Sequence, residues 1–463
     1  MEALYRERRA RFAEEERRLA RRSFRFSIAR FIAFFLFALG LFLLLFPAVG
    51  PRALGLSAVG LVAFVALVIA HDRVVREERR AGLLVRLQDE GLARLVRDWP
   101  ALPLPVLPVA LAGDLPPLAR DLNLFGRASL FHLLGTAHTP PGKAVLADWL
   151  LAPASPGEIA ERQAAVAELA PAIDLRQELE VRARPLERVR PDLEPFFRWA
   201  EDQPWLTGWM IGLARVLAPW PFPALLLWMG GILPFWPFLL LAGINLGLTR
   251  QLGRRIAETY DRISAREDDF QLYAGALIAV AERSFASPRL RRLVASLTAE
   301  GISAARALDL LHRRVVLSDV RHAALLHTPL QLLFLWDFHV LALLERWQRD
   351  FGARARGWLG ALGELEALAA LADLSHDHPE WTFPGVAPQE TMSPALIEAR
   401  ALGHPLLAGT ARVANDVTLG PPGTFLLVTG SNMSGKSTLL RAIGVNAVLA
   451  QAGGPVCAAS LRL

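Results

Sequence analysis

The chain has 463 residues, of which 53% are hydrophobic and only 21% charged, so it is long enough for two to four domains and too apolar for an ordinary soluble protein. Its mean hydropathy of +0.31 indicates that part of the chain lies in lipid. The single cysteine, Cys457, excludes an internal disulfide framework and fits a reducing compartment. The formal net charge of +6, carried mostly by arginine, suits a nucleic-acid partner and an anionic membrane surface equally.

The N-terminal region joins a basic segment to two apolar stretches. Residues 1–30 carry ten arginines against five glutamates, which predicts a solvated helix on the cytoplasmic side of a membrane. Residues 31–51 and 53–70 contain no charged side chain, and each reaches the roughly 18 apolar residues that a membrane-spanning helix requires. We therefore expect a transmembrane hairpin over residues 31–71.

Basic residues bracket this hairpin, whereas its short connection, with Pro47, Gly50 and Pro51, holds only Arg52. Under the positive-inside rule both ends of the hairpin then lie in the cytoplasm. A cleaved signal peptide is the competing interpretation, but the basic region is too long for one and a second apolar stretch follows at once. We expect a multi-pass protein of a bacterial-type inner (plasma) membrane.

Residues 72–204 are expected to begin a helical core. They open with a short helix and an extended, proline-rich segment at residues 99–108. Residues 121–169 then have the pattern of amphipathic helices broken by proline and glycine, which taken alone indicates packing rather than chemistry.

A second apolar region covers residues 205–250. Residues 216–249 contain no charged side chain and turn near Gly230–Gly231, and tryptophan gathers around them, as it does at membrane interfaces. The tryptophans in or beside the region are Trp199, Trp205, Trp209, Trp220, Trp228 and Trp236. We favour a second transmembrane hairpin over a buried core hairpin, although the prolines of the region also allow a kinked or re-entrant hairpin.

Residues 251–375 are predicted to be helical and to form a lever-like core. Leu290, Leu293, Val294 and Leu297 recur at intervals of three and four residues and build one apolar helix face. The arginines on the other faces suit DNA phosphates, although a solvated helix face explains any one of them more simply.

Residues 376–400 are expected to be a linker. His376 and His378 within it have the spacing of a metal-binding pair. Because neither a cysteine nor a matching second pair accompanies them, a polar linker is the simpler interpretation.

The segment GSNMSGKS, from Gly430 to Ser437, fits the G-x-x-x-x-G-K-[ST] phosphate-binding loop without a mismatch. A turn at Pro421, Pro422 and Gly423 and an apolar run at residues 424–429, which predicts a strand, precede it. The segment from Thr438 predicts a helix that ends at Gly453-Gly454-Pro455. A chance glycine-rich turn before a helix is the alternative.

In such a loop the backbone N–H groups and the helix N-terminus attract phosphate oxygens, the lysine reaches the β and γ phosphates, and the serine hydroxyl ligates magnesium. The sequence therefore predicts a site for ATP and Mg²⁺, with Lys436 in the catalytic role and Ser437 as the metal ligand. The predicted nucleotide-binding residues of the loop are Gly430, Ser431, Asn432, Met433, Ser434, Gly435, Lys436, Ser437 and Thr438.

Three further motifs surround this loop: GHPL from Gly403 to Leu406, NDV from Asn415 to Val417, and the extended run from Thr429 to Arg441 with its Asn432-Met433 pair. With them the chain resembles the MutS family of mismatch-repair ATPases, an ABC-type branch of the P-loop proteins. The asparagine-methionine pair makes this match much narrower than a generic phosphate loop. The pattern of residues 121–169 is similar to the start of the family's helical core.

This resemblance implies a multidomain fold: α-helical membrane hairpins, an α-helical MutS-like core and lever, and the first part of an α/β P-loop ATPase domain over residues 401–463. It also implies DNA as a partner beside membrane lipid, and a homodimer, because a second subunit completes the family's active site. Where many relatives stack an aromatic residue on adenine, this chain has Arg412, whose planar guanidinium can stack as well. His404 completes the nucleotide site that the resemblance implies.

The chain departs from the family pattern in two respects. The glycine-x-phenylalanine-x-glutamate motif of mismatch-detecting members is missing, and Phe12-Ala-Glu14, which matches part of it, lies on the basic helix and is attributed to chance. The signature serine loop, the aspartate-glutamate pair and the switch histidine would lie beyond Leu463, so we expect a chain that is incomplete at its C-terminus.

These departures leave ATP hydrolysis open, because turnover needs a carboxylate that holds the metal and positions water. The leading hypothesis is a membrane-anchored, MutS-like ATPase that couples nucleotide binding to structure-directed or sequence-independent DNA contact. A transporter-type membrane ATPase and a nucleotide-binding membrane scaffold without turnover are the alternatives.

Overall fold

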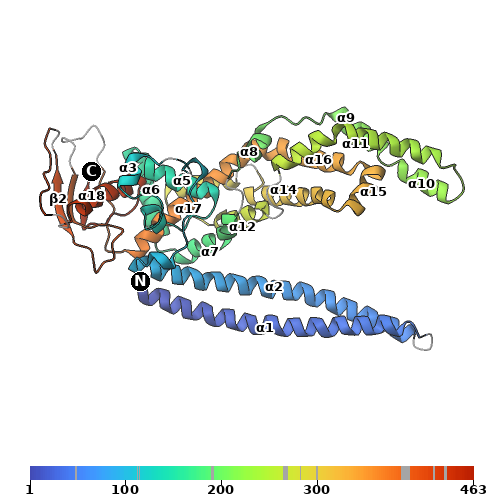
Figure 1. The fold of residues 1–463 in the computed structure, drawn as a ribbon, viewed down its shortest axis with the longest axis horizontal. Coiled ribbons are helices and arrows are strands. Elements are labelled where there is room, and N and C mark those ends of the chain that lie inside the picture. Colours follow the sequence, from blue (N-terminus) through green and yellow to red (C-terminus); the bar gives the residue numbers. More distant parts are fainter. Residues whose placement is uncertain are drawn as a thin grey trace. The chain divides into compact units, whose positions relative to one another are not determined.

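A computed structural model of the chain, drawn in Figure 1, forms two compact units: residues 1–103 with 408–410, and residues 104–407 with 411–463. The structure describes residues 1–46, 50–111, 113, 115–188, 192–263, 269–281, 283–298, 301–386, 397–420, 423–431 and 435–463. The predicted turn residues Pro47, Pro421 and Pro422 and the predicted loop residues Asn432, Met433 and Ser434 lie outside these ranges.

The first unit is a hairpin of two long helices, α1 (Glu2–Leu43) and α2 (Gly50–Val96), followed by the short 3-10 helix η2 (Trp99–Ala101). The helices run antiparallel, because the Ser23 hydroxyl lies 3.1 Å from Nε2 of His71 and the Ser57 hydroxyl donates to the Phe37 carbonyl at 3.3 Å. The boundaries expected near residues 30 and 71 fall inside continuous helices. No proline or paired glycine interrupts either helix at those points, so each passes from its polar half into its apolar half.

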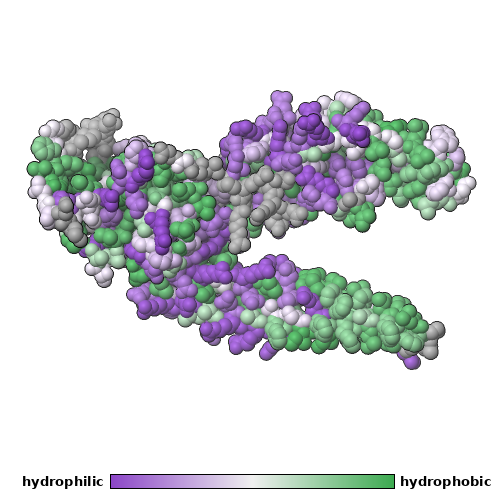
Figure 2. Space-filling view, viewed as in Figure 1, coloured by the Kyte–Doolittle hydropathy of each residue, from purple (hydrophilic) through white to green (hydrophobic). Residues whose placement is uncertain are grey.

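The apolar half of this hairpin buries small residues and exposes large ones. Its buried positions are Ala33, Gly40, Ala53, Ser57 and Gly60. A Cβ on Gly60 would lie 2.5 Å from the backbone nitrogen of Phe37, so the two backbones approach closely there. The large residues turn outward, with Phe31 71% and Leu45 74% exposed, and Figure 2 shows apolar residues over this end of the hairpin.

The second unit is mostly helical. Its helices up to residue 281 are η3 (Val109–Leu111), α3 (Pro117–Asp121), α4 (Leu130–Leu133), α5 (Pro140–Leu151), α6 (Pro156–Leu169), α7 (Ile173–Ala183), η4 (Arg184–Arg188), α8 (Glu194–Glu201), α9 (Gly208–Leu217), α10 (Pro221–Met229), α11 (Trp236–Ile263) and α12 (Asp269–Ala281). The later ones are α13 (Pro288–Thr298), α14 (Ala304–Ser318), η6 (Asp319–His322), α15 (Ala324–Phe334), α16 (Trp336–Trp347), the π-helix η7 (Gln348–Gly352), α17 (Ala353–Asp377) and α18 (Lys436–Ala452).

Helix starts in this unit follow local capping chemistry. The side chains of Thr139 and Ser155 accept the backbone N–H of Gly142 and Glu158, and a proline follows each cap as the first residue of α5 and α6. The described part of residues 251–375 is mostly helical, and on α13 Leu290 and Leu297 are fully buried while Leu293 and Val294 are half-buried.

Helix α17 is the centre of the helical core. Its side chains are buried almost all round, and α5, α6, α7 and α13 pack against it. The fully buried carboxylate of Glu366 accepts the backbone N–H of His138 at 2.9 Å and of Thr139 at 3.2 Å, and it also accepts the Thr139 hydroxyl. This carboxylate fixes the start of α5 against α17.

Helices α9, α10, α11 and α15 form what we call the apolar arm, which leads away from the core in Figure 1. Helices α10 and α11 pack together as a helical hairpin that turns through Gly230–Gly231. Helix α15 lies against both of them, with the rings of Phe222 and Phe334 5.7 Å apart.

Three helices among the described residues are long and apolar enough to cross a membrane: Glu2–Leu43, Arg52–Val96 and Gly208–Met229. The third joins α9 and α10 through a short turn. Helices α15 and α16 would make a fourth only as a pair, and they meet at an angle of 83°.

Helix α17 continues to Asp377, so His376 lies in its last turn rather than in a linker, and the ring of His378 stacks on Trp381 at 4.3 Å. The described residues contain no group of three histidine, cysteine, aspartate or glutamate side chains that could hold a metal ion.

A small antiparallel sheet follows, with strand order β2 (Asn415–Leu419), β1 (Ile397–Leu402), β3 (Ser460–Arg462). The prediction of a strand at residues 424–429 is wrong. This run is irregular, and Phe425 and Leu427 are 83% and 73% exposed. A strand forms only where a neighbour satisfies its backbone N–H and C=O groups, and no described strand pairs with this run.

Candidate nucleotide-binding site

The phosphate-loop motif ends on the first turn of helix α18, as predicted. Gly435 precedes the helix with a φ of +86°, in the left-handed region that favours glycine. The helix ends at Ala452, where Gly453 adopts a φ of +85° and its N–H bonds back to the Ala450 carbonyl. The first-turn N–H groups of Lys436, Ser437 and Thr438 have no acceptor within the helix, which leaves a positive end aimed at the loop.

The side chain of Lys436 folds back over the loop. Its ammonium donates to the carbonyl oxygens of Gly430 and, at 2.6 Å, of Ser431. The Lys436 ammonium therefore lies beside the backbone of the loop. A bound phosphate group would replace these carbonyls as its hydrogen-bond partner.

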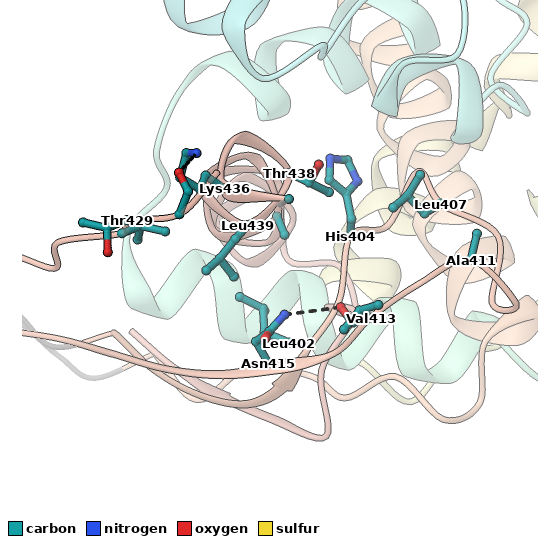
Figure 3. Close-up of a pocket in the computed structure, with 14 residues that line it drawn as sticks. Leu402, His404, Leu407, Ala411, Val413, Asn415, Thr429, Lys436, Thr438 and Leu439 are labelled. Atoms are coloured by element: carbon teal, nitrogen blue, oxygen red, sulfur yellow. Dashed lines mark hydrogen bonds between the residues drawn. The ribbon is translucent and has the colours of Figure 1, made fainter. Parts of the chain in front are cut away.

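A pocket of about 480 Å³ opens beside this end of α18 (Figure 3). Three segments line it: the end of β1 and the turn after it, the approach to β2, and the loop with the start of α18. The lining residues are Leu402, His404, Leu407, Ala411, Val413, Asn415, Val428, Thr429, Gly430, Gly435, Lys436, Thr438, Leu439 and Ala442. Its size is that of a small-molecule site, and its walls combine apolar side chains with the polar groups of His404, Asn415, Thr429, Lys436 and Thr438.

His404, which the resemblance assigns to the nucleotide site, lines this pocket. Its Nδ1 accepts the Leu406 N–H at 3.2 Å, which leaves Nε2 as the donor of the neutral ring. Burial, together with the positive charge of Arg441, lowers the pKa of His404, so the ring is neutral at pH 7.

Arg412 does not line the pocket. Its guanidinium lies over the Trp381 ring, 5.7 Å from the centroid, and donates to Sγ of Cys457 at 3.0 Å. In this arrangement the Arg412 guanidinium packs on Trp381 and Cys457, and its planar face is not turned toward the pocket.

Ser437 is exposed at the first turn of α18 and is not among the lining residues. Its hydroxyl is the one oxygen ligand that the motif assigns to magnesium, and phosphate oxygens and water are the usual remaining ligands of this ion. The donor set therefore fits Mg²⁺ only together with a bound nucleotide.

Asn446, which the sequence analysis did not identify, connects three parts of the site. Its side chain is fully buried, donates to the carbonyls of Gly403 at 2.9 Å and Ala442 at 2.8 Å, and accepts the Cys457 N–H at 2.7 Å. It thereby ties α18 to the turn that carries His404. A polar residue within the apolar run GVNAV is the only sequence signal that could have pointed to it.

The far side of α18 packs on the helical core. The Arg441 guanidinium donates to the Asp121 carbonyl at 3.0 Å, and the Gln451 side chain accepts the Ala154 N–H at 3.2 Å. A Cβ on Gly444 would meet Leu122 at 2.5 Å, and one on Gly453 would meet Arg162 at the same distance. Helix α18 therefore packs closely on Leu122 at Gly444, and glycine is favoured at position 453, where φ is +85°.

Several arginines of the core, which we had considered as contacts for DNA phosphates, form ion pairs with glutamates. Arg289 contacts Glu158, Glu161 and Glu364, and Arg292 lies 2.5 Å from Glu161. Arg356 bridges Glu194 and Glu201.

Residues 119–323 match the family model described as MutS domain III, from α3 through the apolar hairpin to the end of α14 and η6. The DNA mismatch repair protein MutS of Azorhizobium caulinodans is 46% identical over 114 residues, which are 22% of this chain and 12% of that protein. The endonuclease MutS2 of Anaeromyxobacter sp. is 40% identical over 115 residues, 24% of this chain and 14% of that protein. The DNA mismatch repair protein MutS of Parasynechococcus marenigrum is 39% identical over 136 residues, 27% and 14% of the two chains.

These comparisons relate the chain to the MutS family. They bear out the resemblance of its helical core. The matched stretch spans only 12% to 14% of the length of these curated relatives.

Proposed function

We propose that this protein is a membrane-anchored, MutS-related nucleotide-binding protein that couples the binding of ATP to contact with DNA. Helix α18 carries the proposal. Its first turn, at Lys436, borders the pocket, and α18 also packs on the stretch matched by MutS domain III, with Gly444 against Leu122 and Gly453, just after the helix, against Arg162. One rigid element therefore joins the nucleotide pocket to the core.

In this function the loop from Gly430 to Gly435 and the first turn of α18 hold the phosphates, and Lys436 leaves its carbonyl partners to neutralise them. Ser437 would hold Mg²⁺, and His404 and the apolar walls would hold the base and sugar. The metal would supply positive charge that neutralises the phosphates.

DNA contact and a homodimer enter the proposal through the relationship to MutS. The relatives' names, DNA mismatch repair protein and endonuclease, support a nucleic-acid partner. The net charge of +6 is compatible with an electrostatic contact that does not depend on sequence.

Membrane anchoring rests on the α1–α2 hairpin. Small residues inside and large apolar residues outside are the reverse of a soluble helix pair, and they are what lipid-facing helices with closely packed backbones require. The proposed location is a bacterial-type inner membrane, with lipid around the hairpin and the nucleotide domain in the cytoplasm.

The test is ATP binding by the full chain in detergent, measured with a fluorescent ATP analogue and Mg²⁺. Lys436→Ala removes charge-assisted bonds worth about 1.5–3 kcal/mol, so its Kd should rise by roughly tenfold to a hundredfold. Arg462→Ala, which removes a positive charge on β3 outside the pocket, should bind like the wild type. Equal affinities for the two variants, or no binding by the folded wild type, contradict the nucleotide half of the proposal.

The DNA half is tested with the same proteins on branched, mismatched and plain duplexes over a range of salt. Binding should weaken steeply as salt rises, because released counterions drive it, and it should respond to ATP in the wild type but not in Lys436→Ala. Absence of DNA binding at low salt would remove this half and leave the nucleotide site intact.

A further inference from the structure

The tip of the apolar arm carries no charged side chain. Between α10 and α11 the chain reads GGILPF, and the large residues around it face outward, with Met229, Ile232 and Trp236 70%, 71% and 63% exposed. A hairpin that crosses a membrane places its turn in water, where polar residues are expected. The α1–α2 hairpin, by contrast, has Arg52 beside its turn.

The uncharged part of each leg of the arm is also short. The last charge before the tip is Arg215 on α9 and the first after it is Arg250 on α11, and both side chains are exposed. The uncharged part of each leg, residues 216–229 and 236–249, is therefore about 21 Å long at roughly 1.5 Å per residue, although the helices themselves continue past Arg215 and Arg250. This is about two-thirds of the ~30 Å hydrocarbon layer.

Helix α15 extends the apolar surface of the arm. It has 11 residues, and Leu325 and Leu326 on it are 93% and 63% exposed. The chain then breaks at Leu335, which has a φ of 49°, and α16 leaves at 83°. Helix α15 is about 16 Å long, so it too is too short to span the layer.

The backbone groups freed at this break are satisfied by side chains. Asn245 of α11, which is 1% exposed, donates to the Leu332 carbonyl at 2.8 Å. The Gln331 side chain accepts the Asp337 N–H at 3.0 Å and donates to the Thr249 hydroxyl at 2.9 Å. Water would satisfy such groups on a solvated surface, whereas a broken helix at membrane depth needs protein partners.

We infer that the apolar arm enters the membrane from the side of the nucleotide domain and turns back within the hydrocarbon layer, with α15 inserted beside α10 and α11. The occupant of its exposed surface is lipid. This inference rests on the proposed membrane anchoring and makes the arm a second, re-entrant contact that does not cross.

Single cysteines test it in the full chain, in a Cys457→Ala background that removes the one native thiol. Ile232→Cys marks the tip and Leu325→Cys marks α15. Arg52→Cys reports the turn of the spanning hairpin, and Arg313→Cys on α14, an exposed site, reports the side of the nucleotide domain. A membrane-impermeant maleimide is applied to sealed vesicles of both orientations, and each purified variant is then labelled with a dye and reconstituted with nitroxide-bearing phospholipid.

The expected result is that Arg52→Cys and Arg313→Cys react from opposite faces, while Ile232→Cys and Leu325→Cys react from neither and their dyes are quenched by the nitroxide lipid. Reaction of Ile232→Cys from the face of Arg52→Cys means a full crossing and overturns the inference. Reaction from the face of Arg313→Cys, or protection without lipid quenching, places the arm in water or under a protein and also overturns it. If Arg52→Cys reacts only from the face of Arg313→Cys, the anchoring proposal fails. The labels at Ile232 and Leu325 then still show whether the arm is inserted in the membrane.

Discussion

At the scale of single residues, a buried charge cluster holds the helical core together around His138. Nε2 of His138 lies 3.2 Å from Glu180, its Nδ1 lies 3.8 Å from Glu187, and Lys143 lies 3.3 Å from the same Glu187 carboxylate. Burial disfavours the charged imidazole, but the two carboxylates outweigh it and raise the pKa of His138 to about 9. The hydrogen bond to His138 lowers the pKa of Glu187 to about 2.

This cluster predicts a loss of stability in alkali. Because the pKa of His138 is higher in the folded protein than its ordinary 6.5, its contribution is complete below pH 6.5 and is lost as pH rises to about 9. The shift corresponds to about 3 kcal/mol. Urea unfolding of the wild type should therefore show a falling free energy across this range, and His138→Gln should be less stable at pH 6 and should flatten the curve.

The matched control is His322→Gln, which changes an exposed histidine and should keep the wild-type pH profile. A His138→Gln curve parallel to that of the wild type would mean that His138 is not charged in the folded protein. The contribution of Glu187 has the opposite sign, since it is present above about pH 4.5 and is lost as pH falls toward 2.

At the scale of elements, the sequence pattern predicted the helices whose formation depends mainly on neighbouring residues. The helix after the phosphate loop, the apolar hairpins and the helical run from residue 251 follow from apolar periodicity, caps and glycine ends. The run at residues 424–429 has strand composition, but a strand also depends on a neighbour from elsewhere in the chain. The continuity of α1 and α2 was missed because a change from basic to apolar composition does not stop a helix.

The close contact of α1 and α2 gives a prediction at this scale. At Gly60 even a Cβ atom would lie 2.5 Å from the Phe37 nitrogen, so Gly60→Leu forces a side chain into a filled space. Gly55→Leu, on the same helix, places its side chain in open space. Overpacking costs about 1–3 kcal/mol, so Gly60→Leu should open the hairpin. In detergent, tryptic cleavage in residues 1–96 should accelerate by roughly tenfold, because cleavage follows the open population. Equal rates for the two variants would show that the backbones can separate at no cost.

At the scale of the whole molecule, the contacts that the sequence could not reveal join residues far apart in the chain. Asn446 was invisible as a site residue because its partners, Gly403 and Cys457, become neighbours only after folding. The same holds for Glu366, which caps α5 from α17. The phosphate-loop prediction rests on consecutive residues, whereas the orientation of Arg412 depends on its contacts with Trp381 and Cys457.

The proposed nucleotide pocket and the core both contact helix α18, and this predicts an effect at a distance. Gly444 does not line the pocket, and its Cβ position is filled by Leu122 of the core. Gly444→Leu should push α18 away from the core and so disturb the first turn that carries Lys436. A strain of about 1–2 kcal/mol transmitted to the pocket would weaken ATP binding roughly fivefold to thirtyfold.

The control for this effect is Gly357→Leu, an exposed glycine of α17 with open space around its Cβ position. It makes the same chemical change in a helix and should leave both stability and affinity near the wild-type values, because leucine favours the helix over glycine. Titration with the fluorescent ATP analogue gives the affinity, and urea unfolding gives the stability. A Gly444→Leu protein that loses stability but binds ATP like Gly357→Leu would show that the pocket does not depend on docking to the core, and α18 would then not couple the two.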